Sequence, residues 1–207
     1  MAAAPALPTL QAIASSDDLT STGPLAGALS TLFEPSPVLF SHLVPQLHRT
    51  RDRASALTYQ SLISDAARTI ATWDPDLQAS FIGAHPRIGE VNGLSALSAA
   101  EQAARATPPE VLERLGVLNA AYEVRYEGLR YITFVNGRSR KEIMEEMEAF
   151  LGVGKGDIDL QQIASSKVTT GGEAWLAEVK RAVHDVGQIA RSRLRALGID
   201  EEVPRDA

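Results

Sequence analysis

Apolar residues recur along the chain at the spacing of amphipathic helices, in which residues three and four apart share one face. One stripe consists of Tyr59, Leu62, Ile63, Ala66 and Ile70. A second stripe, near the carboxyl end, consists of Val179, Ala182, Val183, Val186, Ala190, Leu194 and Leu197. The second stripe predicts a long last helix over roughly 173–197, which Gly198 is expected to end.

Capping signals predict where further helices begin and end. Asp74-Pro75 starts a short helix, and Thr107-Pro108-Pro109-Glu110 combines a cap, a proline at the first position and a glutamate at the third. Ser139 and Glu142 form a capping box, and Gly152 is expected to end the helix that they begin.

Three stretches depart from the helical pattern. Residues 131–135 read as a strand, but no partner run is evident, so we expect an extended segment packed between helices. Residues 1–23 are rich in Ala, Pro, Ser and Thr and are expected to be a poorly ordered extension. Residues 152–170 read as a loop insertion within a single domain over 24–200. The pattern predicts an all-α, single-domain helical bundle with one short extended segment.

Composition narrows the class of protein. The 207 residues suit one domain, and the absence of Cys excludes a disulfide scaffold, thiol nucleophiles and thiolate metal ligands. The net charge of −6 argues against a nucleic-acid partner, and no apolar run is long enough to span a membrane. Because the start lacks signal-peptide features and the end lacks a Ser-Lys-Leu tripeptide, we expect a cytoplasmic rather than a peroxisomal protein.

His85 is the first candidate for chemistry. It precedes Pro86, which disfavours the helical conformation at residue 85, and Gly83 and Gly89 flank the pair. His85 therefore lies at a rigid break after a helix, and its side chain suits proton transfer near neutral pH. A structural turn histidine bonded to backbone explains the same pattern.

Ser98, Glu101 and Gln102 are the second candidate group. Their order fits a base and an amide that point into a pocket. By spacing alone a plain capping box is the favoured interpretation, since Ser98 and Glu101 have the required separation.

Arg193 is the third candidate, because it lies inside the apolar stripe of the last predicted helix. Arg191 and Arg195 fall on the opposite, polar stripe together with His184 and Gln188. A charge on the core face needs a partner. That partner is either a protein carboxylate or an anionic substrate held in a bidentate fork. No pattern of metal ligands and no phosphate-binding loop is present.

These positions occur in an order typical of one family. The pieces are His85-Pro86, Ser98-x-x-Glu101-Gln102, Leu118-Asn119-x-x-Tyr122-x-x-Arg125-Tyr126, Tyr131–Val135, Gly137-Arg138-Ser139 with Glu142-Ile143, and Ile189-Ala190-x-x-Arg193-Leu194. Each piece is weak alone, but the ordered set over roughly residues 30–198 is specific. The chain resembles the OHCU decarboxylases, the 2-oxo-4-hydroxy-4-carboxy-5-ureidoimidazoline decarboxylases of urate degradation.

The resemblance implies an all-helical enzyme, usually a homodimer, that uses no metal or organic cofactor. Its small-molecule substrate, the ureidoimidazoline, would lose its carboxylate to give (S)-allantoin. The family's catalytic histidine falls on His85 and its acidic partner on Glu101. The substrate-binding positions that the resemblance implies are Pro86, Ser98, Gln102, Tyr131, Ile132, Thr133, Phe134, Val135 and Arg193.

Two departures from the family pattern bear on the site. Arg87-Ile88 replaces the more common Asp-Leu after His-Pro, so Arg87 either adds an anion contact or faces solvent. The stretch from Arg125 to Tyr131 is one residue longer than usual, which leaves the register of the substrate-facing backbone open. Two alternatives therefore stand beside the decarboxylase: a non-catalytic helical interaction module, and an enzyme that acts on a related ureide.

Overall fold

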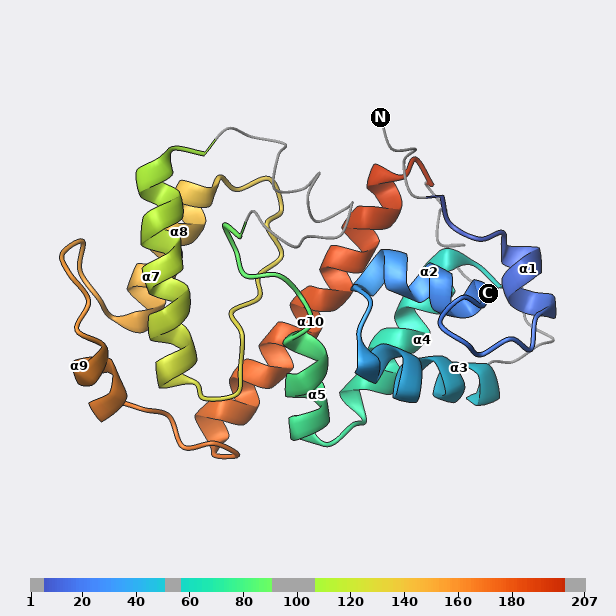
Figure 1. Cartoon of the computed structure of the whole chain (residues 1–207), viewed down its shortest axis with the longest axis horizontal. Coiled ribbons are helices and arrows are strands. Elements are labelled where there is room, and N and C mark those ends of the chain that lie inside the picture. Colours follow the sequence, from blue (N-terminus) through green and yellow to red (C-terminus); the bar gives the residue numbers. More distant parts are fainter. Residues whose placement is uncertain (1–5, 51–56, 91–106, 200–207) are drawn as a thin grey trace, which may run out of the picture.

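A computed structural model describes residues 6–50, 57–90 and 107–199. Helices are the sole regular elements within these residues, which confirms the predicted all-α fold. In chain order they are α1 (Leu10–Ser15), α2 (Pro24–Phe33), the π-helical η1 (Leu39–Leu43), α3 (Val44–Thr50), α4 (Tyr59–Ala71), α5 (Pro75–Ile82), α7 (Pro109–Arg125), α8 (Arg140–Leu151), α9 (Leu160–Ser165) and α10 (Glu173–Ala196) (Figure 1).

Helix α10 runs across the molecule and connects its two halves (Figure 1). One half contains α2, α4 and α5, which all pack against α10. The other half contains α7, which packs against α8 and α9. At the amino end of α10, the Trp175 indole N–H donates to the Glu127 carbonyl oxygen just beyond α7 (3.0 Å). The last helix is therefore the common support of both halves.

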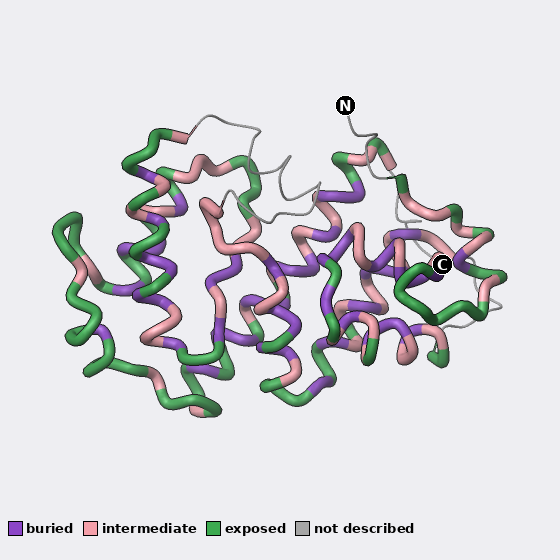
Figure 2. Tube along the Cα trace, in the orientation of Figure 1, coloured by how far each residue is buried: buried purple, intermediate pink, exposed green. Residues whose placement is uncertain are grey.

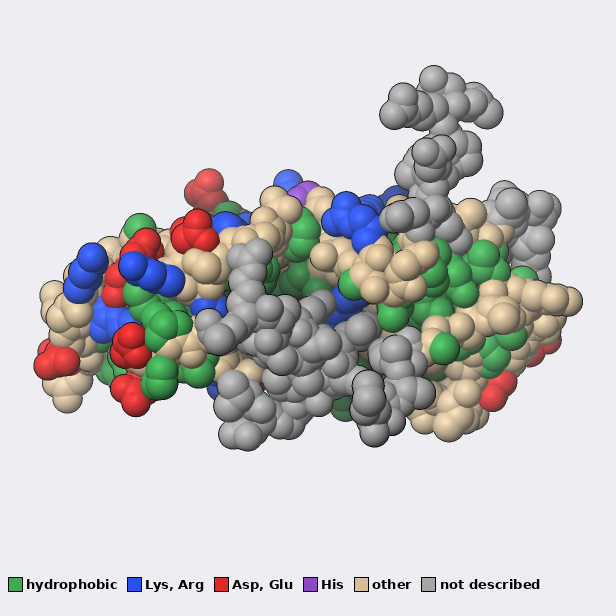
Figure 3. Space-filling view, turned by 90° about the horizontal axis from the view of Figure 1, so that it is seen from above, with side chains coloured by type: hydrophobic (Ala, Val, Ile, Leu, Met, Phe, Trp, Pro, Cys, Tyr) green, Lys and Arg blue, Asp and Glu red, His purple; other side chains and the backbone are tan. Residues whose placement is uncertain are grey.

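The predicted stripes form the core. All five residues of the 59–70 stripe are buried in α4, and the 179–197 stripe is buried in α10 up to Leu194. Buried positions follow the faces where helices meet, whereas α9 and its flanking loops are mostly exposed (Figure 2). Acidic and basic side chains gather at the α7–α9 end of the molecule (Figure 3).

Two short helices lie where irregular chain was expected. Helix α1 lies within the 1–23 stretch, and its Ile13 is buried. The Tyr59 hydroxyl also donates to the Pro8 carbonyl oxygen (2.7 Å), which ties this stretch to α4. Helix α9 lies within 152–170, where Asp159 caps it and Ile163 is buried. Both helices have six residues, too few to repeat an apolar pattern in the sequence.

The predicted start of α7 is one residue early. The helix has Pro108 as its N-cap and Pro109 as its first residue, so Thr107 does not cap it. The Thr107 hydroxyl instead accepts from Arg140 at the start of α8 (3.1 Å). The capping box of Ser139 and Glu142 and the left-handed Gly152 that ends α8 are both confirmed.

Candidate active site

His85 lies in the turn that follows α5. Its backbone N–H donates to the Ile82 carbonyl oxygen (3.0 Å), which closes the turn directly after the helix. Gly89 completes the turn with φ of +83°, and a Cβ at that position would meet Leu115 Cδ1 at 3.1 Å. The imidazole is 3% exposed and meets the Phe81 ring edge-on, with 5.9 Å between ring centroids. The turn thus places a histidine inside the protein instead of at its surface.

The imidazole of His85 is buried without a hydrogen bond. Neither ring nitrogen has a partner among the described residues. Burial, and then the positive charge of Arg193, lower the pKa of His85 to about 4, although the Glu34 carboxylate and the nearby backbone of Phe81 and Ile82 act in the opposite direction. The Phe81 and Ile82 backbone thus lies close to the ring, but neither ring nitrogen forms a well-aligned hydrogen bond among the described residues, which leaves the ring available for chemistry.

Arg193 has a protein carboxylate as its partner. Its Nη2 atom lies 2.6 Å from Glu34 Oε1, and its Nη1 donates to the Leu32 carbonyl oxygen at 3.4 Å. Both charged side chains are buried, Arg193 at 2% exposure and Glu34 at 4%. The sequence allowed either a protein carboxylate or an anionic substrate as the partner of Arg193, and the structure contains the protein carboxylate.

A cavity of about 390 Å³ opens beside His85. Its wall contains the predicted site residues His85, Pro86, Tyr131, Ile132, Thr133, Phe134, Val135 and Arg193. The Arg193 side chain thus faces two ways, toward Glu34 and toward the cavity. Residues brought together here come from the turn after α5, the extended segment and α10, which are far apart in the sequence.

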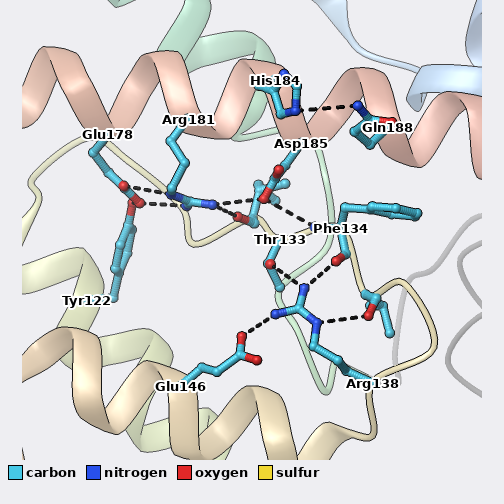
Figure 4. Close-up of polar contacts among 12 residues, drawn as sticks. Tyr122, Thr133, Phe134, Arg138, Glu146, Glu178, Arg181, His184, Asp185 and Gln188 are labelled. Atoms are coloured by element: carbon cyan, nitrogen blue, oxygen red, sulfur yellow. Dashed lines mark hydrogen bonds and ion pairs between the residues drawn. The ribbon is translucent and has the colours of Figure 1, made fainter.

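The extended segment reaches the cavity because α10 holds its backbone (Figure 4). The Arg181 guanidinium donates to the Ile132 carbonyl oxygen (2.8 Å) and to Asp185 Oδ2 (2.9 Å). Asp185 in turn accepts from the Phe134 backbone N–H (3.2 Å). Residues 131–135 are neither helix nor strand, as predicted, and side chains of α10 satisfy backbone groups that a partner strand would otherwise bind.

Arg138 fixes the same segment from the other side (Figure 4). Its Nε donates to the Val135 carbonyl oxygen and its Nη2 to Thr133 Oγ1, both at 3.0 Å. The guanidinium also bonds the Phe134 carbonyl oxygen and pairs with Glu146 of α8. These contacts set the register of the cavity wall, which the sequence left open.

Arg87 does not reach the cavity. Its guanidinium forms a bidentate pair with Glu123 of α7, at 2.7 and 2.9 Å. This pair gives a structural role to the arginine that stands where the family more commonly has an aspartate. His184 lies exposed on α10 and contacts Gln188 (3.4 Å), as the polar stripe predicts. Arg195 was assigned to that polar stripe, but it also lines the cavity.

Ser98, Glu101 and Gln102 lie outside the described residues. Several cavity residues escaped the sequence analysis: Ile88, Asn136, Gly137, Arg140, Ile189, Ser192 and Arg195. Ser192 and Arg195 were not predictable from Arg193, because residues one and two positions apart on a helix point in different directions. Glu34 was missed altogether, since nothing in its local sequence distinguishes it from a surface acid.

The described parts of the chain contain neither a cluster of metal-ligating side chains nor a membrane-spanning helix. There, no group of three or more His, Asp or Glu side chains is placed to hold a metal ion. No helix within 6–50, 57–90 and 107–199 is long and apolar enough to cross a membrane.

Comparison with known proteins identifies one family. Residues 20–156, more than half of the chain, match the family model described as OHCU decarboxylase. The matched range contains His85, Glu101 and the extended segment, and it ends before α10 with Arg193. Comparisons with curated proteins and with solved structures gave no match.

Proposed function

The chain belongs to the OHCU decarboxylase family and is a carboxy-lyase of urate degradation, and from this premise we propose that the cavity beside His85 is its active site. The observation that carries the proposal is the buried, unbonded imidazole of His85 on the same cavity wall as the Arg193 guanidinium. An orphaned polar group is costly to bury, so its presence in a cavity favours a role in chemistry.

The cavity has the charge that an anionic ureide requires. Arg140, Arg193 and Arg195 line it, and no carboxylate does so among the described residues. Arg193, which lines the cavity, would bind ring or ureido oxygens of the substrate. The backbone of Tyr131–Val135 would contact the ring. From the family resemblance, Ser98 and Gln102 bind the ureido and ring groups, and Glu101 sets the tautomer of His85.

His85 would first act as a base. With a pKa of about 4 its ring is neutral near pH 7 and can accept a proton. As the carbon–carbon bond to the carboxylate breaks, CO₂ leaves and the electron pair passes into the ring imine, whose nitrogen takes a proton from solvent. His85 accepts the proton of the 4-hydroxyl group, which becomes a carbonyl, and returns that proton to the adjacent ring carbon. Return to one face gives (S)-allantoin.

The replacement of His85 by asparagine tests the assignment. We expect His85→Asn to fold and to lose roughly 10²- to 10⁴-fold in kcat/KM, the usual contribution of a positioned acid or base. The assay is formation of (S)-allantoin from freshly generated substrate, followed by circular dichroism. His184→Asn is the matched control, because that histidine is exposed on α10, and it should keep the wild-type rate.

Two results would contradict the proposal. Wild-type kinetics in a folded His85→Asn variant would remove His85 from the chemistry. Absence of (S)-allantoin with the wild-type protein would favour the non-catalytic helical module or a related ureide as substrate. We also propose, from the resemblance, that the enzyme is a homodimer, which sedimentation equilibrium measures directly.

A further inference from the structure

Glu34 has a backbone conformation that its residue type disfavours. It follows the last residue of α2 with φ of 99° and ψ of 134°. Among the described residues, Glu34 and Asn136 are the non-glycine residues with positive φ, and asparagine tolerates that region far better than glutamate. Glycine would adopt the conformation without a steric cost. A glutamate at this position indicates a requirement for the side chain.

The side chain of Glu34 forms an ion pair with Arg193. The two are separated by 159 residues in the sequence, and their contact of 2.6 Å is buried where α2 packs against α10. Two apolar side chains would satisfy stability at least as well as a buried ion pair. Arg193 lines the cavity and Glu34 does not. Glu34 therefore cannot contact a substrate in the cavity itself, and positions one only through the Arg193 guanidinium.

We propose that Glu34 is a positioning residue for the decarboxylation, an inference that rests on the proposed function. Its carboxylate holds the Arg193 guanidinium at the cavity wall, where the substrate would bind. Its negative charge offsets the positive charge of Arg193 beside the His85 imidazole. Glu34 thereby sets both the geometry and the net charge of the site without touching the substrate.

The charges that shift the pKa of His85 come from two elements. Arg193 of α10 lowers the pKa of His85, and Glu34 at the end of α2 raises it. Arg130, in the segment after α7, donates to the His85 carbonyl oxygen (2.5 Å) and not to the ring. Removal of the Glu34 charge would remove the interaction that raises the pKa of His85, so the imidazole would become harder to protonate and a weaker base.

Two substitutions separate charge from geometry. Glu34→Gln keeps the size of the side chain and removes its charge. We expect kcat/KM at pH 7 to fall about 10- to 100-fold, and the titration of the His85 ring to move to lower pH. Glu34→Asp keeps the charge but is shorter by one methylene. We expect its His85 titration to stay near that of the wild type while kcat/KM still falls.

The matched control is Glu148→Gln. Glu148 is another buried acid, 7% exposed, and pairs with Arg114 (2.7 Å) away from the cavity. The His85 titration is read by NMR of the imidazole nitrogens, since the chain has four histidines and His85→Asn assigns the resonance. Rates are expressed per mole of folded protein. We expect Glu148→Gln to lose stability but keep the wild-type kcat/KM and His85 titration.

The results discriminate between the two proposals. If both folded Glu34 variants behave like Glu148→Gln in rate and in His85 titration, the pair is structural only and the inference is wrong. If Glu34→Gln does not fold, Glu34→Asp decides by its kcat/KM. If instead the wild type is inactive or His85→Asn is fully active, the proposed function fails, and the NMR titration still decides whether Glu34 acts on His85.

Discussion

The buried imidazole of His85 makes the stability of the folded chain depend on pH. In the unfolded chain its pKa is about 6.5, whereas burial lowers it to about 4 in the folded protein. Below pH 6.5 the unfolded chain therefore binds a proton that the folded protein does not. The free energy of unfolding should fall as the pH drops from 6.5 to 4, by roughly 3 kcal/mol in total for this group. Above pH 6.5 His85 contributes no pH dependence.

Urea unfolding at pH 7.5 and pH 4.5 measures this loss. We expect His85→Asn to lose less stability between the two pH values than the wild type, because asparagine does not titrate. His184→Asn should lose as much as the wild type, since that side chain is exposed. An equal loss in the wild type and in His85→Asn would show that the ring titrates normally.

Individual site residues differ in how far the sequence could reveal them. His85 was found because its turn combines proline and glycine, and Arg193 because it interrupts an apolar stripe. The partner of Arg193 was not predictable, because its contact with Glu34 spans 159 residues and leaves no local pattern. Because Glu34 is buried against Arg193, we expect Arg193→Met to destabilise the fold as well as to weaken substrate binding.

At the scale of elements, the extended segment depends on arginines that never enter the cavity. Arg138→Met removes the donors to Thr133 Oγ1 and to the Phe134 and Val135 carbonyl oxygens. We expect KM to rise about tenfold, because the cavity wall loses its fixed register. The stability cost should be only about 1 kcal/mol, since the arginine is partly exposed.

Steady-state kinetics and urea unfolding of Arg138→Met provide the two readings. Arg68→Met is the matched control, because Arg68 is an exposed partner of Asp65 on α4, and it should change neither. Unchanged KM in Arg138→Met would mean that Arg181 and Asp185 hold the segment without help.

The long elements were predictable and the short ones were not. Helices α4 and α10 repeat an apolar stripe over several turns, so periodicity alone finds them. Helices α1 and α9 each bury a single isoleucine, and one buried residue does not produce an apolar repeat in the sequence. The start of α7 was misplaced because Thr107 bonds a distant arginine of α8 instead of capping its own helix. Tertiary contacts decide such cases.

At the scale of the whole molecule, α10 should make the two halves unfold together. Trp73 lies in one half, where it contacts the Phe81 ring and donates to the Gln46 side chain (2.8 Å). Trp175 lies at the other end, bonded to the Glu127 carbonyl oxygen. The chain has these two tryptophans and no others. Each reports on a different half, and α10 contacts both: it packs against α2, α4 and α5, and its Glu178 and Trp175 side chains bond Tyr122 and the Glu127 carbonyl oxygen.

Fluorescence of the single-tryptophan variants Trp73→Phe and Trp175→Phe measures this coupling. After correction for the stability of each variant by circular dichroism, we expect the fluorescence and circular dichroism transitions to coincide in urea, as in two-state unfolding. A fluorescence midpoint that differs from the circular dichroism midpoint within one variant would show that a half unfolds separately.

The Glu34–Arg193 pair also constrains how the chain could diverge by mutation. Glycine at position 34 would relax the backbone, and two apolar residues would fill the interface without buried charge. Each single change, however, removes one charge of a buried ion pair and is expected to make the protein less stable. A descendant protein that no longer needed the reaction would therefore pass through a less stable intermediate before both residues were apolar. Loss of the ion pair from this interface thus requires two substitutions.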